Sequence, residues 1–230
     1  MKVPVIVVLV AGVLVSAGCS SSGGSKAPKV LPFVHSPVGS VLTYRIDQQT
    51  TPRIVKVLSV KQVSAGQSYL VSQSIGSIKN VGTVLVGADG SESQALDALR
   101  FKNGDELRFS KTVELPSAAV LATHKPFDET NSLYEVGKPT DSLPVSVAVT
   151  GGEIAKVTVP AGTFTAQEID VSITLQLPDP SKDVALDIDY ERASGVGTVR
   201  SVTSVRFGDT GNPVVHTEEL TRFVAGRTLA

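Results

Sequence analysis

The sequence predicts an all-β, mainly antiparallel protein, and two observations support that prediction. Apolar and polar residues alternate through residues 168–177 and again through residues 183–191, as they do in strands with one buried and one solvated face. Evidence for helix is thin, because only residues 91–99 combine a capping-box spacing with a short apolar run, enough for one or two turns. A β-sandwich is the alternative arrangement for strands of this kind.

The first strands follow the same alternation. Leu42, Tyr44 and Ile46 begin it near the amino end, and residues 53–63 form a long Val-rich strand that we expect to be buried on parts of both faces. Residues 124–142 are polar and contain two prolines and a glycine, which predicts a long connection between two parts of the fold.

Two hairpins can be tested by pairing their side chains. Residues 145–159 predict a hairpin with its loop at residues 151–153, because this register places the apolar side chains of both arms on one face. A later hairpin, turning near residues 193–195, would bring Asp189 near Arg200 and Asp183 near Arg206.

Length and composition limit the class of protein. The 230 residues are 41% hydrophobic and 19% charged, which is too apolar for a disordered chain, and the formal net charge of −1 offers nothing to attract nucleic acid. Residues 31–226 are enough for one substantial antiparallel β domain or for two similar β halves, at residues 31–123 and 126–226. Val-x-x-Gly patterns recur weakly near residues 37–66 and 135–162. Two similar halves and a chance recurrence explain this repetition equally well.

The amino end predicts a lipoprotein signal peptide over residues 1–18. Lys2 is followed by an apolar run over residues 3–15, which is shorter than the roughly 20 residues that cross a bilayer. Ser-Ala-Gly-Cys follows at residues 16–19 and resembles the lipobox of bacterial lipoproteins. That resemblance implies cleavage between Gly18 and Cys19 and acylation of Cys19, the only cysteine of the chain.

Residues 19–30 have the Ser- and Gly-rich composition of a flexible tether, with a reach of about 15–20 Å. Two or three acyl chains give stable anchoring, so the folded part is expected to lie close to a membrane. The expected location is the cell envelope, first the outer membrane facing the periplasm. The outer leaflet of the cytoplasmic membrane and the cell surface are the alternatives.

The search for catalytic or metal-binding chemistry gives no candidate residues. His35, His124 and His216 are far apart in the sequence and show no metal-ligand spacing. The chain has no Gly-x-Ser-x-Gly nucleophile turn and no phosphate-binding glycine loop. We therefore predict no catalytic residue, no metal and no cofactor.

One carboxylate cluster stands out, formed by Asp183, Asp187, Asp189 and Glu191. Calcium takes six to eight oxygen ligands from a curled loop, whereas these residues lie along a straight strand. The interpretation favoured is a solvated face that pairs with Arg200 and Arg206. The chain also lacks Trp, which weakens a sugar-binding role.

Three segments resemble an uncharacterised group of bacterial lipoproteins, sometimes labelled TapB-like. They are the VTVPAGTF segment at residues 157–164, the YERASGVGTV segment at residues 190–199 and the PVGSVLTY segment at residues 37–44, where Leu42 stands at a position that is usually Trp. The resemblance implies a strongly curved antiparallel sheet, similar to the half-barrels of the LolA and LolB lipoprotein carriers. It brings no catalytic residues.

Three functions remain open. The first is a non-catalytic, membrane-anchored module that binds a hydrophobic ligand or an envelope protein. The second is a structural or assembly component of the envelope, and the third, least favoured, is a hydrolase. A filled interior would favour a scaffold, and a large apolar groove would favour ligand carriage.

Overall fold

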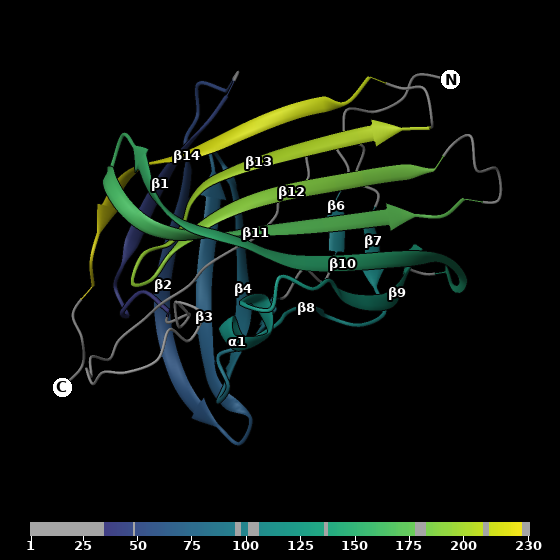
Figure 1. Ribbon diagram of the computed structural model, residues 1–230, viewed down its shortest axis with the longest axis horizontal. Helices are drawn as coiled ribbons and strands as arrows, with labels where there is room; N and C mark the ends of the chain where they lie inside the picture. The colour runs from purple at the N-terminus through teal and green to yellow at the C-terminus, as the bar shows by residue number, and fades with distance from the viewer. Residues whose placement is uncertain are drawn as a thin grey trace.

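The structure, a computed structural model, describes residues 35–47, 49–94, 98–100, 106–135, 138–177, 183–208 and 212–226 (Figure 1). The expected signal peptide, its cleavage site at Gly18 and Cys19, and the tether over residues 19–30 lie outside these residues. Within the described ranges, no helix is long and apolar enough to cross a membrane.

Fourteen antiparallel strands form one sheet. In chain order they are β1 (Val41–Ile46), β2 (Arg53–Val63), β3 (Gly66–Ile75), β4 (Ile78–Gly87), β5 (Glu92–Gln94), β6 (Ala98–Arg100), β7 (Glu106–Phe109), β8 (Val113–Leu115), β9 (Phe127–Glu135), β10 (Lys138–Val159), β11 (Gly162–Leu175), β12 (Val184–Ala193), β13 (Gly197–Phe207) and β14 (Val214–Val224). Their order across the sheet is β6-β7-β9-β10-β11-β12-β13-β14-β1-β2-β3-β4-β5-β8.

The sheet curls until it is nearly closed into a barrel with one seam, and Figure 1 shows β10 to β14 in front of β1 to β4. The last strand of the chain, β14, pairs with the first, β1. This architecture confirms the all-β antiparallel prediction and the expected curvature.

Strand alternation fills the inside of the curl with two apolar clusters. One lies under β9 to β12 and includes the single-turn helix α1 (Ala118–Leu121). The other lies between β1 to β3 and the far ends of β10, β11 and β13. Ile169 and Val171 of β11 are buried in phase, as the sequence alternation predicted. The expectation that residues 53–63 are buried on parts of both faces is wrong, because the buried residues of β2, which are Arg53, Val55 and Val57, all lie on one face.

The predicted hairpin over residues 145–159 is wrong. β10 runs from Lys138 to Val159, and it pairs with β9 over residues 138–149 and with β11 over residues 145–159. The expected loop is an irregularity between Gly151 and Ile154, where the strand bends past α1. Both arrangements bury the same Val side chains, so the face pattern could not separate them.

Two further expectations are corrected. The expected helix does not begin at Glu92, because residues 92–94 form β5, which lies between β4 and β8 and uses its backbone in the sheet. Residues 124–142 are not a connection, since most of them form β9 and the start of β10. In both places backbone pairing with two flanking strands decides the structure, and local composition carries no sign of those partners.

Candidate functional site

The three histidines lie in separate parts of the fold. His35 is buried inside the curl, His124 follows α1 and His216 lies on β14. The Nδ1 atom of His124 is 2.8 Å from the carbonyl oxygen of Gly151, which ties the turn after α1 to β10. Over the described ranges, no group of three His, Cys, Asp or Glu side chains could hold a metal ion.

The acidic residues of β12 face outward, as predicted, but two of their expected partners are wrong. Arg200 forms its ion pair with Glu191, not Asp189, and Arg206 lies opposite Ala185, not Asp183. The pairing differs from the expected hairpin by two residues: the turn is centred so that Ala193 lies opposite Gly197, which accounts for one, and the register shift between Glu191 and Arg192 adds the other.

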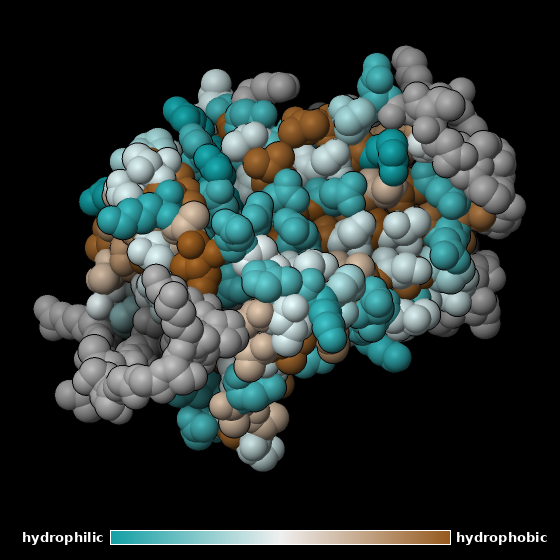
Figure 2. Space-filling view, in the orientation of Figure 1, coloured by the Kyte–Doolittle hydropathy of each residue, from teal (hydrophilic) through white to brown (hydrophobic). Residues whose placement is uncertain are grey.

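The outer face of β11 and β12 therefore carries carboxylates that are not all compensated by cations. Asp170 lies directly opposite Asp189, and Ser172 donates a 2.7 Å hydrogen bond to Asp187. Burial, with repulsion from Glu168 and Asp189, raises the pKa of Asp170, and burial with repulsion from Asp187 raises that of Asp189. Figure 2 shows hydrophilic side chains over the middle of this front face.

A shallow hollow of about 250 Å³ lies on the same outer face, over β9 to β11. Its lining includes Asp128, Thr130, Ser146, Ser172 and Thr174. The register places Thr130, Ser146 and Thr174 side by side in one row. The hollow is hydroxyl-rich and acidic, and it can receive hydrogen-bond donors or a positively charged group.

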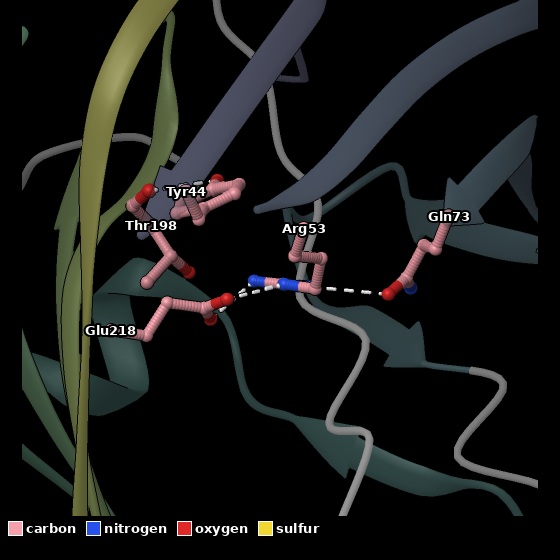
Figure 3. A network of polar contacts seen from close by, with 5 residues as sticks. All are labelled: Tyr44, Arg53, Gln73, Thr198 and Glu218. Atoms are coloured by element: carbon pink, nitrogen blue, oxygen red, sulfur yellow. Dashed lines mark hydrogen bonds and ion pairs between the residues drawn. The ribbon is translucent and has the colours of Figure 1, made fainter. Parts of the chain in front are cut away.

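Inside the curl, a charged group lies against Tyr44, a member of the second apolar cluster. The Nε and Nη2 atoms of Arg53 each donate a 2.5 Å hydrogen bond to a different carboxylate oxygen of Glu218, and its Nη1 atom donates to Gln73 at 3.1 Å (Figure 3). The guanidinium carbon lies 4.4 Å from the centre of the Tyr44 ring, within cation–π range. The Tyr44 hydroxyl donates to the carbonyl oxygen of Thr198 at 2.9 Å, so this contact network links β1, β2, β3, β13 and β14.

A second buried pair lies nearby. Arg192 of β12 donates a 2.8 Å hydrogen bond to Glu92 of β5, and both side chains are 1% exposed. Burial lowers the pKa of Arg192, against the opposing effect of Glu92. For Arg53, burial also acts to lower the pKa, but Glu218 outweighs it and the pKa is raised. Both arginines are cations held by carboxylates, a bonding pattern that serves cohesion of the fold.

His35, the first described residue, enters this interior. Its ring stacks on Tyr69 with 3.6 Å between ring centres and 9° between planes. Burial, together with the positive charge of Arg192, lowers the pKa of His35 from 6.5 to about 3, so the ring is neutral. Neither ring nitrogen has a hydrogen-bond partner among the described residues.

The sequence interpretation missed these interior groups, although a signal was present. Arg53 alternates with Val55 and Val57, which are buried, so its side chain points to the same inward side. Arg192 lies two residues after the buried Tyr190, so it points inward as Tyr190 does. Glu218 is in phase with Leu220 in the same way. A charged residue at an inward position of a strand indicates a buried ion pair, and the partner then has to be found by the fold.

Comparison with known proteins gives the fold. No family model and no curated protein matches the chain. A crystal structure of a protein from Bacteroides fragilis, described as exported and as having a YmcC-like fold, is similar with a TM-score of 0.55 and 16% identity. The match covers 86% of this chain and 100% of that one.

A second crystal structure, described as a lipoprotein from Parabacteroides distasonis, is similar with a TM-score of 0.53 and 12% identity, over 82% of this chain and 96% of that one. At these identities the likeness shows a shared fold. One neighbour is described as exported and the other as a lipoprotein, and neither singles out the TapB-like or the LolA and LolB proteins.

Proposed function

We propose that this protein is a lipid-anchored component of the bacterial cell envelope that recognises a protein partner on its outer surface. The observation that carries the proposal is the filled interior. Side chains of two apolar clusters and two buried ion pairs occupy the inside of the curl, in the part of the chain that the structure describes. A carrier of a hydrophobic ligand needs an apolar cavity of several hundred Å³ instead.

The outer hollow over β9 to β11 is the surface that we assign to the partner. Its carboxylate and hydroxyl groups suit a basic, hydrogen-bonding segment of another protein. The descriptions of the two structural neighbours, one as exported and one as a lipoprotein, support an envelope location for this protein.

A photo-crosslinking experiment in the native envelope tests this assignment. A photoreactive residue replaces Ser146 in the hollow, and in a matched variant it replaces Ser204, which also faces outward but lies on β13 beyond the hollow. We expect one dominant crosslinked protein from position 146 and none of that mass from position 204. The same products from both positions would refute recognition at the hollow.

Native mass spectrometry of the purified acylated protein tests the filled interior. We expect the mass of the polypeptide plus its covalent anchor and nothing else. A bound, non-covalent lipid at about one copy per protein would contradict the proposal and favour ligand carriage.

A further inference from the structure

The outer face of β2, β3 and β4 exposes aliphatic and basic side chains together. Leu58 is 42% exposed, Leu70 38% and Val81 54%, and Lys56, Lys61 and Lys79 are exposed among them. These six residues are called the β2–β4 outer patch below. Single exposed aliphatic residues are common on proteins, so the grouping of these six has to come from the strand register.

The register places the six on one side of the sheet. Val57, Val71 and Tyr69 are buried, so their neighbours along the strands point outward. Lys56 lies opposite Ser72, and Ser72 lies opposite Val81, which forms one row across the three strands. Leu58 is the extra residue of a bulge beside Leu70, so two aliphatic side chains meet there.

Charge on this part of the chain has one sign. Residues 48–88 contain no Asp or Glu, and their four charged residues are Arg53, Lys56, Lys61 and Lys79. Arg53 is turned inward and neutralised by Glu218, so all three remaining cations belong to the patch. The opposite side of the molecule, over β9 to β12, carries the acidic outer face already described (Figure 1). The two outer faces of the protein therefore differ in character: the face of β2 to β4 is basic and aliphatic, and the face of β9 to β12 is acidic.

The segment that leads toward the expected anchor starts beside β2 and β3. The amide of Gly39 donates to the carbonyl oxygen of Val57 at 2.8 Å, and the amide of Val57 donates to Ser40 at 3.1 Å, so residues 39–40 run beside the bulge of β2. His35 is fixed on Tyr69, on the inner side of β3, whereas Leu70 of the patch points outward. Fifteen residues separate His35 from Cys19, with a reach of about 20 Å if they behave as a flexible chain.

We propose that the β2–β4 outer patch lies against the anionic phospholipid surface that holds the lipid anchor. Lysines beside a membrane are attracted to anionic headgroups, and exposed aliphatic side chains gain by contact with the interface. The tether keeps the folded domain near the bilayer, and the positive charge of the patch turns this face toward anionic headgroups, so that the acidic hollow points away from them. The inference rests on one part of the proposed function, the lipid anchor at Cys19.

The single cysteine makes the orientation measurable. Because Cys19 is acylated in the mature lipoprotein, Leu70→Cys introduces one free thiol on the patch and Ser204→Cys introduces one on the opposite side. Each is labelled with a polarity-sensitive fluorophore on the full acylated protein. The proteins are reconstituted in vesicles of phosphatidylcholine and phosphatidylglycerol that contain a lipid-bound quencher.

We expect quenching at position 70 to exceed that at position 204 by more than about two-fold, and to fall when phosphatidylglycerol is omitted. Replacing Lys56, Lys61 and Lys79 together by Glu should reduce it in the same way, with an unchanged melting temperature as the control for folding. Equal quenching at both positions would overturn the proposal. A label at position 70 that is shielded from water without lipid quenching would also overturn it, in favour of a protein contact.

Flotation separates this inference from the proposed function. Protein that floats with the vesicles but shows equal quenching retains its anchor, and only the orientation fails. Protein that does not float lacks the anchor, which overturns both. The crosslinking experiment at the hollow is a separate measurement, and its outcome does not depend on which face of the protein turns toward the membrane.

Discussion

The guanidinium of Arg192 lies 2.8 Å from the carboxylate of Glu92, and this contact joins β12 to β5, strands that lie far apart in the sheet order. Both side chains are almost wholly buried, so each charge depends on the other for compensation. The pair therefore holds the two sides of the curl together across its interior.

Arg192→Met should lower the free energy of unfolding by about 3–5 kcal/mol, because it leaves the Glu92 carboxylate buried without its cation. Urea denaturation at neutral pH measures the change. Arg45→Met is the matched control, since it breaks an exposed ion pair with Glu219 and should cost at most about 1 kcal/mol. Equal losses in the two variants would mean that burial adds nothing to the Arg192 pair.

Acid should destabilise the protein through His35. Its pKa falls from 6.5 in the unfolded chain to about 3 in the fold, so below pH 6.5 the unfolded state binds the proton and the folded state does not. Stability is then fully present above pH 6.5 and is lost as the pH falls. From pH 7 to pH 5, we expect this residue to remove about 2 kcal/mol from the free energy of unfolding.

His35→Phe keeps a ring on Tyr69 and removes the proton site, so it should abolish that part of the pH dependence. Urea titrations at pH 7 and pH 5 give the difference directly. Comparison of variants is needed because Asp170 and Asp189, with raised pKa values, act in the opposite direction in mild acid. An unchanged pH dependence in His35→Phe would exclude His35 as its source.

The fold class was accessible from sequence because alternation is a local signal. Ile169 and Val171 are buried in β11 as their period-two pattern predicted, and the same holds for Leu186 and Ile188 in β12. The alternation that indicates the buried face of a strand can be recognised from the residues of that strand alone.

Pairing partners were not accessible in the same way. Glycines at residues 151–152 suggested a turn, and only the fold shows that α1 needs that space beside a continuous β10. Glu191 pairs with Arg200 because the turn and a bulge each shift the register by one residue, and nothing in the local pattern marks either shift. For the candidate site, the strand alternation could have shown that Arg53 and Arg192 point inward. It could not have shown their partners, Glu218 and Glu92, which come from strands far away in the sequence.

Gly151→Ala should destabilise the fold. A Cβ atom at position 151 would lie 2.2 Å from the carbonyl oxygen of Leu121 and 2.8 Å from its Cβ, so α1 would have to move away from β10. Overpacking of this kind costs about 1–3 kcal/mol. Gly82→Ala in β4 is the control, because its new Cβ would meet nothing within 4 Å and the substitution should be neutral or slightly stabilising. Thermal and urea unfolding measure the stability of both variants. If Gly82→Ala were the more destabilising, the packing explanation would be wrong.

Cys19→Ser should release the protein from the membrane, because Cys19 is the only thiol in the chain that could carry a lipid. Acyl chains supply the stable part of the anchoring, whereas the β2–β4 outer patch alone has three lysines and a few aliphatic side chains. Metabolic labelling with a clickable fatty acid, followed by detergent phase partitioning, should give a labelled, detergent-phase wild type and an unlabelled, aqueous-phase variant. Ser21→Ala, two residues further along, controls for disturbance of the processing site. Fatty-acid labelling of the Cys19→Ser protein would show that the lipid attaches elsewhere, and the tether length assumed for the membrane-facing patch would then no longer hold.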